Sequence, residues 1–552
     1  MPAFLSTGQL LYLVGAIAWL LLALRVRRPG FLLAGVLAAN GWAWLLTNFP
    51  LQSLYGLPGS SDRLNNLAFC TVVAAGQSPL RTYQVGHIHF EPFWGVLVAA
   101  LSGWSPERVL LLYPFLSLVM AAGFALALYL ALRGPDSREN AWGPWERALI
   151  AGFATLLSSA PLDHIETYRV PWAMTFLLKP NHTLGLVLFP VFLQALARVR
   201  TWRGRIAVGF LLHLIGWVFV LHMAFICVGL VVFALWALAE RRADARTVTL
   251  DVLVVIGVNA LIVSPYLYML LTGYPVPASP LATIPAGSPH VLEPTTRYLP
   301  LTLLGAWGAV VAHRRGDRLG RAWSGQMAGA LLVWLGHLVL SALQISRERD
   351  ESYYWVRFLL AASAGIGAWD LALRFGARLW RGFAEPSRLC AAVCLLALPY
   401  SLPYWWDPLS MDSYFRASVG PLPERLSRPT DWIRRNTDPR AVFAGDPGYA
   451  RYVAALGARR VLWSNNMNQP KDAGSRYALD ARLLRDVEPA EVLREASRWG
   501  VRYVLVTRDW LATQPGLTLE TVSTRRHLRR AYLFEDPAGD FVAIFELVEE
   551  PT

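Results

Sequence analysis

Twelve apolar runs, each close to the length of a membrane-crossing helix, most constrain how this chain of 552 residues can fold. A helix needs roughly 17 to 25 mostly apolar residues to cross the hydrocarbon core of a bilayer. Hydrophobic residues make up 55% of the chain and charged residues only 16%, whereas about a quarter of the residues in soluble domains are charged. The sequence therefore predicts a polytopic α-helical membrane protein with about 12 transmembrane helices. The runs are 10–24, 31–47, 107–132, 147–161, 183–198, 206–221, 223–239, 250–271, 298–312, 324–343, 353–373 and 389–404.

Arginine-rich tracts between the apolar runs indicate their orientation. RVRR occupies 25–28, RVRTWRGR occupies 198–205 and HRRGDRLGR occupies 313–321. Lys and Arg mark the cytoplasmic loops of membrane proteins, so the net charge of +13 is interpreted as a sign of topology and not of a nucleic-acid partner. Every second connector carries Arg, which places both termini outside the cytoplasm. The predicted cytoplasmic connectors are 25–30, 133–146, 199–205, 240–249, 313–323 and 374–388.

The last apolar run ends at residue 404, and this divides the chain into two predicted domains. Residues 1–404 form a transmembrane domain with an outer loop at 48–106, and residues 405–552 form an extracytoplasmic domain. Within the outer loop, 64–75 and 91–103 are too short to cross the bilayer and are predicted to be amphipathic helices at its interface. The remaining predicted outer segments are 162–182, 273–297 and 344–352.

The sequence after about Trp406 alternates between helix and strand patterns. PTDWIRRNT, PGYARYVAALG and PAEVLREASRWG are predicted helices, and AVFAGD, RRVLWS and VRYVLVTRD are predicted strands. Alternation of strands with helices favours a small parallel sheet, and a hairpin that turns at Pro537 to Asp540 closes the domain. GDPG at 445–448 lacks the glycine spacing and the lysine of a phosphate loop, so it is interpreted as a strand-to-helix turn.

Asp62 opens the outer loop and is the first acidic residue after the second apolar run. A carboxylate just outside the bilayer can take the proton of an acceptor hydroxyl while that hydroxyl attacks, if the two lie within hydrogen-bond reach. The alternative is a structural role as the N-cap of a helix that begins at Arg63, since Asp is a preferred cap. Spacing alone does not decide between these roles.

His87, His89 and Glu91 form an H-x-H-x-E array in the same loop. An extended segment would place all three side chains on one face, where they could hold Zn²⁺ or another divalent ion such as Mg²⁺ or Mn²⁺. His222 or His182 could add a further ligand. The alternatives are that these groups bind sugar hydroxyls or a phosphate directly, or that they cap an interfacial helix.

The second outer segment, LDHIETYRVPWAMTFLLKPNHT, places more ionisable side chains on the same predicted side. Asp163 and Glu166 would project together from a helix, where they could bind a metal ion, orient an acceptor or act as a base. Lys179 is a compact ammonium suited to a phosphate oxygen. A lysine that snorkels to the membrane interface would occupy the same position.

The third outer segment, ISRERDESYYWVRF, is predicted to begin a helix. Asp350 and Glu351 suit the positive end of the helix dipole, which could be their whole role. Arg357 lies one turn inside an apolar run, where an unpaired charge is costly. It is therefore expected to face a polar cavity, in which its guanidinium could hold a lipid-linked phosphate through two hydrogen bonds.

Together these motifs resemble the GT-C superfamily of membrane glycosyltransferases, which includes protein mannosyltransferases and aminoarabinose transferases. The resemblance covers essentially the whole chain. It rests on Asp62 at the start of a long outer loop, on the second acidic segment and on the predicted α/β tail. Its further motifs are AAGQSP, HFEPFWGVLVAALSGWSPERVLLL, HTLGLVLFPVFLQAL and YYWVRFLLAASAGIGAW.

The resemblance implies transfer of a sugar from a polyprenyl phosphate or diphosphate carrier to an acceptor on the outer face. Asp62 would be the general base, with Asp163 and Glu166 as the second acidic motif. The chain departs from the family plan in having an extra helix before the acidic loop and no plain Asp-x-Asp, which leaves metal dependence open. The residues implied in binding the substrate or its phosphate are Arg63, Arg169, Lys179, His182, Arg347, Arg349, Tyr353 and Arg357.

A transporter or flippase for a lipid-linked saccharide is the main alternative, and an inactive relative with a binding tail is another. A transporter is expected to show repeated halves and polar groups at mid-bilayer depth, whereas here the polar groups gather at one face. Lys179 and Lys471 are the only lysines, and such an Arg bias is typical of a high-GC bacterial source. The expected location is therefore a bacterial inner membrane, and the expected partners are a polyprenyl-linked sugar, an extracytoplasmic glycan, lipid or protein acceptor, and the bilayer itself.

Overall fold

Long helices make up most of the described part of the chain. The structure is a computed structural model, and for some helical residues it describes the backbone alone. The described residues are 14, 17–18, 21–22, 25, 28–34, 61–86, 89, 91–133, 142–158, 180–273, 299–343, 349–379, 385–388, 390, 393, 423–464, 472–485 and 490–548.

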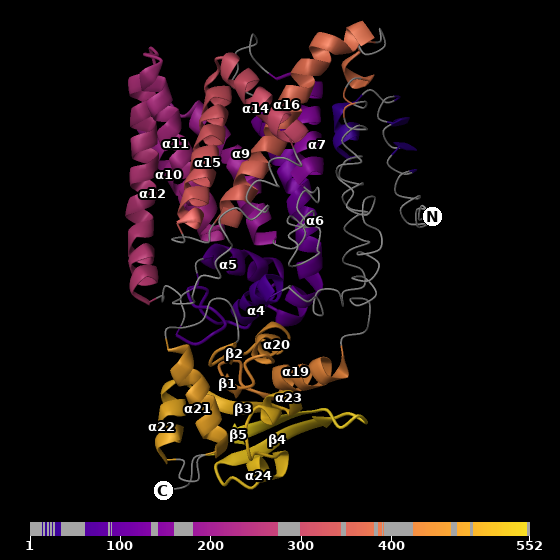
Figure 1. Ribbon diagram of the computed structural model, residues 1–552, viewed down its shortest axis with the longest axis vertical. Helices are drawn as coiled ribbons and strands as arrows, with labels where there is room; N and C mark the ends of the chain where they lie inside the picture. Colours follow the sequence, from indigo (N-terminus) through magenta and orange to yellow (C-terminus); the bar gives the residue numbers. More distant parts are fainter. Residues whose placement is uncertain are drawn as a thin grey trace. The chain divides into compact units, whose positions relative to one another are not determined.

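The chain divides into two units, named here the helical unit and the loop–sheet unit. The helical unit comprises Met1–Phe49, Phe115–Ser264 and Pro280–Arg416, and the loop–sheet unit comprises Pro50–Pro114, Pro265–Ser279 and Ala417–Thr552. Figure 1 shows the long helices as extended ribbons. They are α6 (Pro106–Ala131), α7 (Pro144–Ser158), α9 (Pro180–Arg198), α10 (Trp202–Val218), α11 (Val220–Ala239), α12 (Ala245–Gly273), α14 (Leu299–Arg314), α15 (Arg318–Ala342) and α16 (Arg349–Leu379).

These helices coincide with the predicted apolar runs from 107–132 through 353–373, which confirms the helical assignment there. By length and composition, three helices among the described residues could cross a membrane: Val220–Ala239, Ala245–Pro265 and Phe358–Gly376. A bent pair, Pro92–Leu101 with Pro106–Tyr113, would make a fourth.

The first two predicted runs and the last one fall largely outside the described residues. The structure therefore supports apolar, membrane-spanning helices, and the full count of about 12 stays a prediction of the sequence.

Helices α14 and α16 pack with their backbones in contact. A Cβ atom at Gly308 would overlap the carbonyl oxygen of Ser363, and one at Gly367 would overlap the carbonyl oxygen of Leu304. Only glycine permits this approach. Between two helices in lipid, van der Waals packing replaces the hydrophobic effect as the driving force, and small residues at the interface increase that packing.

Ion pairs join the Arg-rich connectors at one end of the helical unit. Glu146 of connector 133–146 pairs with Arg315 of connector 313–323 at 3.1 Å. His313 contacts Glu240 of connector 240–249 at 2.8 Å. These contacts place three predicted cytoplasmic connectors on the same side, as the alternation of basic connectors requires.

Asp251 is the most buried acidic residue among the ion pairs at this end of the helical unit. Its side chain is fully buried at the start of α12 and contacts both Arg205 of α10 and Arg318 of α15. Two guanidinium groups offset the desolvation of a single carboxylate, so the cluster joins three helices without an uncompensated buried charge.

The loop–sheet unit holds a five-stranded sheet with strand order β2-β1-β3-β5-β4. Strands β2, β1 and β3 run parallel, whereas β5 is antiparallel to both β3 and β4. The strands are β1 (Val442–Gly445), β2 (Arg460–Val461), β3 (Val501–Thr507), β4 (Leu528–Glu535) and β5 (Phe541–Leu547). The helices of this unit are α4 (Ser61–Ala74), α5 (Pro92–Leu101), α19 (Glu424–Asn436), α20 (Ala450–Ala455), α21 (Ala473–Arg485), α22 (Ala490–Arg498), α23 (Arg508–Ala512) and α24 (Leu519–Ser523).

The expectation of a parallel sheet is wrong for part of this sheet. The predicted hairpin exists, but β5 pairs with β3 over Tyr503 to Thr507, so the hairpin extends the sheet and makes it mixed. GDPG is a strand-to-helix turn, as expected: β1 ends at Gly445, and Asp446 Oδ1 accepts hydrogen bonds from the backbone N–H groups of Gly448 and Tyr449.

The first outer loop is part of this same unit. Val461 of β2 donates its N–H to the carbonyl of Tyr83 and accepts from the N–H of Val85, both at 2.9 Å. Helix α4 packs on α20, where Thr71 Oγ1 donates to the carbonyl of Ala454 at 2.9 Å. Helices α4 and α5 are present where the sequence predicted two helices in this loop, and their position at a membrane interface stays a prediction. The backbone pairing places the loop and the C-terminal segment on one side of any membrane that the chain spans.

Asp480 of α21 is a fully buried carboxyl group beneath the sheet. Its oxygens accept hydrogen bonds from the N–H of Gly445 and from Nε1 of Trp463. Burial raises the pKa of Asp480 to about 8, because removal from water disfavours the ionised form more than these two donors favour it.

Replacing Asp251 by Asn is expected to lower the free energy of unfolding by about 3 kcal/mol, because two buried guanidinium groups lose their counter-charge. Denaturant titration of the purified protein in detergent measures this. Asp244→Asn is the matched control, since its ion pair with Arg242 is more exposed, and it is expected to cost less than about 1 kcal/mol. Equal losses in the two variants would contradict the role of burial.

The contribution of Asp480 to the stability of the loop–sheet unit is expected to fall as pH rises from about 4 to about 8. Across that interval Asp480 holds a proton in the folded state but has lost it in the unfolded state, so the unfolded state binds fewer protons. Apparent melting temperature measured against pH tests this. In Asp480→Asn the amide nitrogen faces an N–H donor, so stability starts lower, but the contribution of residue 480 to the slope disappears. An unchanged slope in that variant would overturn the assignment.

Candidate functional site

The predicted base, Asp62, lies in the first turn of α4. The N-cap alternative required Asp62 to precede the helix. The helix begins at Ser61, so Asp62 lies inside it. Only the helix position of Asp62 and Arg63 is described. Asn66 follows Asp62 by one turn on the same helix. The contacts of Asn66 therefore show which elements lie next to this part of α4.

Asn66 connects α4 to α5 and α6. Its side-chain oxygen accepts hydrogen bonds from Nε1 of Trp94 at 2.6 Å and from the hydroxyl of Tyr113 at 2.7 Å. Trp94 and Tyr113 are almost completely buried, so their donors need a partner within the protein. The neighbouring Asn65 accepts a hydrogen bond from the hydroxyl of Tyr83 at 2.7 Å.

The start of α6 follows from its sequence, SPE. Ser105 Oγ accepts a hydrogen bond from the N–H of Arg108, and Pro106 occupies the first helical position, where its missing N–H has no cost. Glu107 in the first turn suits the helix dipole. The backbone reverses at Gly103 and Trp104, both with positive φ, so that α5 and α6 meet at 99°.

Glu91 and His89 lie beside this polar junction. Glu91 is buried just before α5 but makes no side-chain capping hydrogen bond, so capping of that helix does not explain it. The imidazole of His89 packs on the ring of Phe69, and burial lowers the pKa of His89 to about 3. Burial, together with the negative charge of Glu91, raises the pKa of the Cys70 thiol. At neutral pH, His89 and Cys70 are therefore uncharged.

The described residues contain no group of three or more His, Cys, Asp or Glu side chains that could hold a metal ion. His87, the first member of the H-x-H-x-E array, lies outside the described residues, so the array as a whole stays a prediction. His89 has the neutral imidazole that metal binding requires, but its ring lies against an aromatic face.

In the helical unit, α9, α11 and α16 meet around Trp355, near the N-terminal end of each helix. A Cβ at Gly185 of α9 would lie 2.5 Å from Nδ1 of His222, and the ring of His222 lies 4.9 Å from that of Trp355. His182, Tyr353 and Arg357, whose helix positions alone are described, belong to these same stretches of α9 and α16.

Of the other predicted site residues, Arg349 is the first residue of α16. Those outside the described residues are Asp163, Glu166, Arg169, Lys179 and Arg347. Conversely, Asn66, Trp94 and Tyr113 were missed by the sequence reasoning. The pair of amides Asn65 and Asn66 inside a mostly apolar helix was the available signal, because amides among apolar residues usually have hydrogen-bond partners within the protein.

No protein-family model matches the sequence, and no match was found among curated proteins. Similar solved structures exist. The oligosaccharyltransferase AglB of Archaeoglobus fulgidus, in complex with an inhibitory peptide and a dolichol-phosphate, is 14% identical with a TM-score of 0.47, covering 93% of this chain and 74% of its own. A second structure of the Archaeoglobus fulgidus oligosaccharyltransferase, in complex with Zn and sulfate, is 14% identical with a TM-score of 0.48, covering 92% of this chain and 72% of its own.

ArnT of Cupriavidus metallidurans, bound to undecaprenyl phosphate, is 15% identical with a TM-score of 0.48, covering 93% of this chain and 98% of its own. AglB and ArnT are both members of the GT-C superfamily, the superfamily that the sequence motifs resemble. At these identities and TM-scores below 0.5, the likeness does not by itself establish a shared activity.

Replacing Asn66 by Leu is expected to destabilise the protein by about 2 to 4 kcal/mol, since Trp94 and Tyr113 lose a shared acceptor. The isosteric Asn66→Asp keeps an acceptor oxygen and should lose less. Denaturant titration followed by tryptophan fluorescence measures both. If the Leu variant proved as stable as the Asp variant, the hydrogen bonds would not hold the junction together.

Proposed function

We propose that this protein is an integral membrane glycosyltransferase that moves a sugar from a polyprenyl-phosphate-linked donor to an acceptor on the extracytoplasmic face. Asp62 acts as the general base. The donor class and the role of Asp62 come from the sequence resemblance, and AglB and ArnT were solved with dolichol-phosphate and undecaprenyl phosphate, carriers of the same class.

The proposal rests on the hydrogen bonds that join the first outer loop to its neighbouring helices and to the C-terminal segment. The turn of α4 that follows Asp62 is joined to α5 and α6 through Asn66, and α4 is joined to the C-terminal segment through Thr71. Catalysis requires reacting groups held in a fixed geometry. A loop that served only to connect two spans would need no such network of buried polar contacts.

The proposed reaction is a single displacement. The Asp62 carboxylate accepts the proton of the acceptor hydroxyl while the hydroxyl oxygen bonds to the anomeric carbon. The bond from that carbon to the phosphate oxygen breaks, and its electron pair leaves with the polyprenyl phosphate. Backside attack inverts the anomeric configuration. Arg349 and Arg357 of α16 and Lys179 would compensate the charge that develops on the leaving phosphate.

Asp163 and Glu166 would form the second acidic motif and orient the acceptor. The remaining proposed substrate contacts are Arg63, Arg169, His182, Arg347 and Tyr353. The array of His87, His89 and Glu91 is proposed to bind either a divalent ion or the sugar hydroxyls, and the displacement described above involves neither.

Asp62→Asn is expected to lower the rate of sugar transfer by about 10²- to 10⁴-fold, the usual contribution of a general base. The assay uses membranes that contain the protein and a radiolabelled polyprenyl-phosphate sugar. Asp244→Asn, which changes an exposed carboxylate between α11 and α12, is the matched control and should keep full activity. Unchanged transfer by Asp62→Asn would remove Asp62 as the base. Movement of the labelled lipid across the membrane without any transfer by the wild type would favour the flippase.

A further inference from the structure

A segment of the first outer loop, Tyr83–Gly86, pairs with the edge of the C-terminal sheet through an isolated parallel bridge. Val461 of β2 makes backbone hydrogen bonds to both Tyr83 and Val85, and Gln84 forms a parallel bridge with Val461. β2 is an edge strand, so these bonds satisfy backbone groups that the sheet would otherwise leave unpaired. Gln84 Oε1 also accepts a hydrogen bond from the N–H of Ser464.

Arg476 of α21 binds the C-terminal end of this loop segment. Its Nη1 donates to the carbonyl of Val85 in the loop and, at 2.7 Å, to the carbonyl of Leu462 just after β2. Its Nε contacts Asp472 at 3.1 Å, and its guanidinium lies 4.3 Å from the ring centre of Trp499. The side chain is 4% exposed, so one planar cation holds the loop and the sheet together in a nearly water-free position.

Gly86 completes the contact. Its φ is +79°, a conformation that other residues rarely adopt. A Cβ at this position would lie 3.0 Å from Nη2 of Arg476 and 3.2 Å from the ring of Trp499. Gly86 thus turns the chain directly under the guanidinium, and the next residue is His87, the first member of the H-x-H-x-E array.

The array is anchored at its other end as well. Glu91 precedes α5, and Trp94 of α5 donates to Asn66 on α4. His89 and Glu91 therefore lie between two fixed points, one supplied by the C-terminal domain and the other by the helix that carries Asp62.

We propose that Arg476 is a positioning residue for the transfer site: by holding the Tyr83–Gly86 segment against the C-terminal sheet, it sets the placement of His89 and Glu91. This inference rests on the proposed glycosyltransferase function and assigns the C-terminal domain a part in it. A misplacement of about 1 Å in a reacting group can cost two orders of magnitude in rate, so a clamp outside the reaction centre can control turnover.

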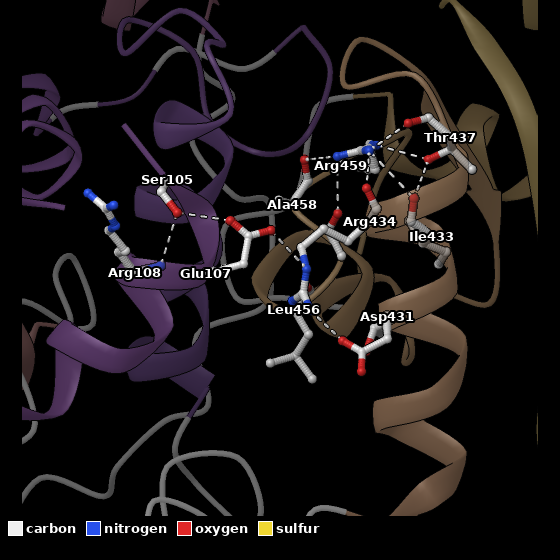
Figure 2. Close-up of polar contacts among 12 residues, drawn as sticks. Ser105, Glu107, Arg108, Asp431, Ile433, Arg434, Thr437, Leu456, Ala458 and Arg459 are labelled. Carbon is white, nitrogen blue, oxygen red and sulfur yellow. Dashed lines mark hydrogen bonds and ion pairs between the residues drawn. The ribbon is translucent and has the colours of Figure 1, made fainter. Parts of the chain in front are cut away.

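A second contact between the loop and the domain has a different character. Figure 2 shows Glu107 at the start of α6 paired with Arg434 of α19 at 3.2 Å, and Arg434 also contacts Asp431. Glu107 is 57% exposed, and exposed ion pairs contribute little. Loss of this pair should therefore leave turnover close to that of the wild type, which makes Glu107→Gln a control for loss of any loop–domain contact.

Arg476→Ala is expected to lower kcat for sugar transfer by about 10- to 100-fold while KM for the labelled donor changes less than about 3-fold. Arg476→Lys keeps the charge but not the planar two-point contact, so an intermediate kcat is expected. Gly86→Ala should reproduce the defect. The double variant should be no slower than the slower single variant, because both changes act on one element. Arg482→Ala, on the same helix but paired with Glu495, should retain the wild-type kcat.

Hydrogen exchange of the full-length protein provides a readout that does not depend on activity. In Arg476→Ala the amides of residues 83–86 should exchange at least about 10-fold faster, with β3 and β5 unchanged. Unaltered exchange, or faster exchange with a wild-type kcat, overturns the positioning role and leaves the proposed function standing. A loss of kcat that merely follows loss of folded protein also overturns it. Absence of transfer by the wild type overturns the proposed function and, with it, a role of Arg476 in catalysis. This holds even if the amides of residues 83–86 exchange faster in Arg476→Ala.

Discussion

Two backbone hydrogen bonds, from Val461 to Tyr83 and from Val85 to Val461, join parts of the chain that lie far apart in sequence. They pair the first outer loop with the edge of the C-terminal sheet. The loop has few regular elements of its own, and its stability depends on what its backbone groups pair with. With this pairing in place, Arg476 gains a partner in the loop, and Thr71 and Tyr83 of the loop gain partners in the C-terminal segment. The loop and the C-terminal domain therefore belong to one compact unit.

At two junctions of this protein a buried charged group has compensating partners. Asp251 lies between two arginines where three helices meet. Arg459 is 3% exposed and donates to Thr437 and to the carbonyls of Arg434, Gly457 and Ala458. Figure 2 shows Thr437, Arg434 and Ala458 around its guanidinium. A buried charge without partners is strongly destabilising, so such groups fix one arrangement of the elements that meet there.

Much of the local structure could be predicted from the sequence. The apolar runs contain helices because the pattern of nonpolar residues is long and uninterrupted. The C-terminal strands and the hairpin were found because alternation and turn residues are local signals. The pairing of β5 with β3 was not found, since the partner of a strand is a long-range choice. Helix α21 was not assigned either, and both Asp480 and Arg476 belong to it.

For the candidate site, the sequence by itself determined the residue types and their order: an acidic residue at the start of the outer loop, the H-x-H-x-E array, and a basic helix start at Arg349. Composition also determined that the chain has membrane-spanning helices, because an apolar helix in lipid must satisfy its backbone internally. Only the tertiary structure decided that Asn66, Trp94 and Tyr113 form one junction, and that Arg476 holds the segment before the array. The physical reason is that these are directional contacts between distant segments, and no local pattern in the sequence encodes which donor will meet which acceptor.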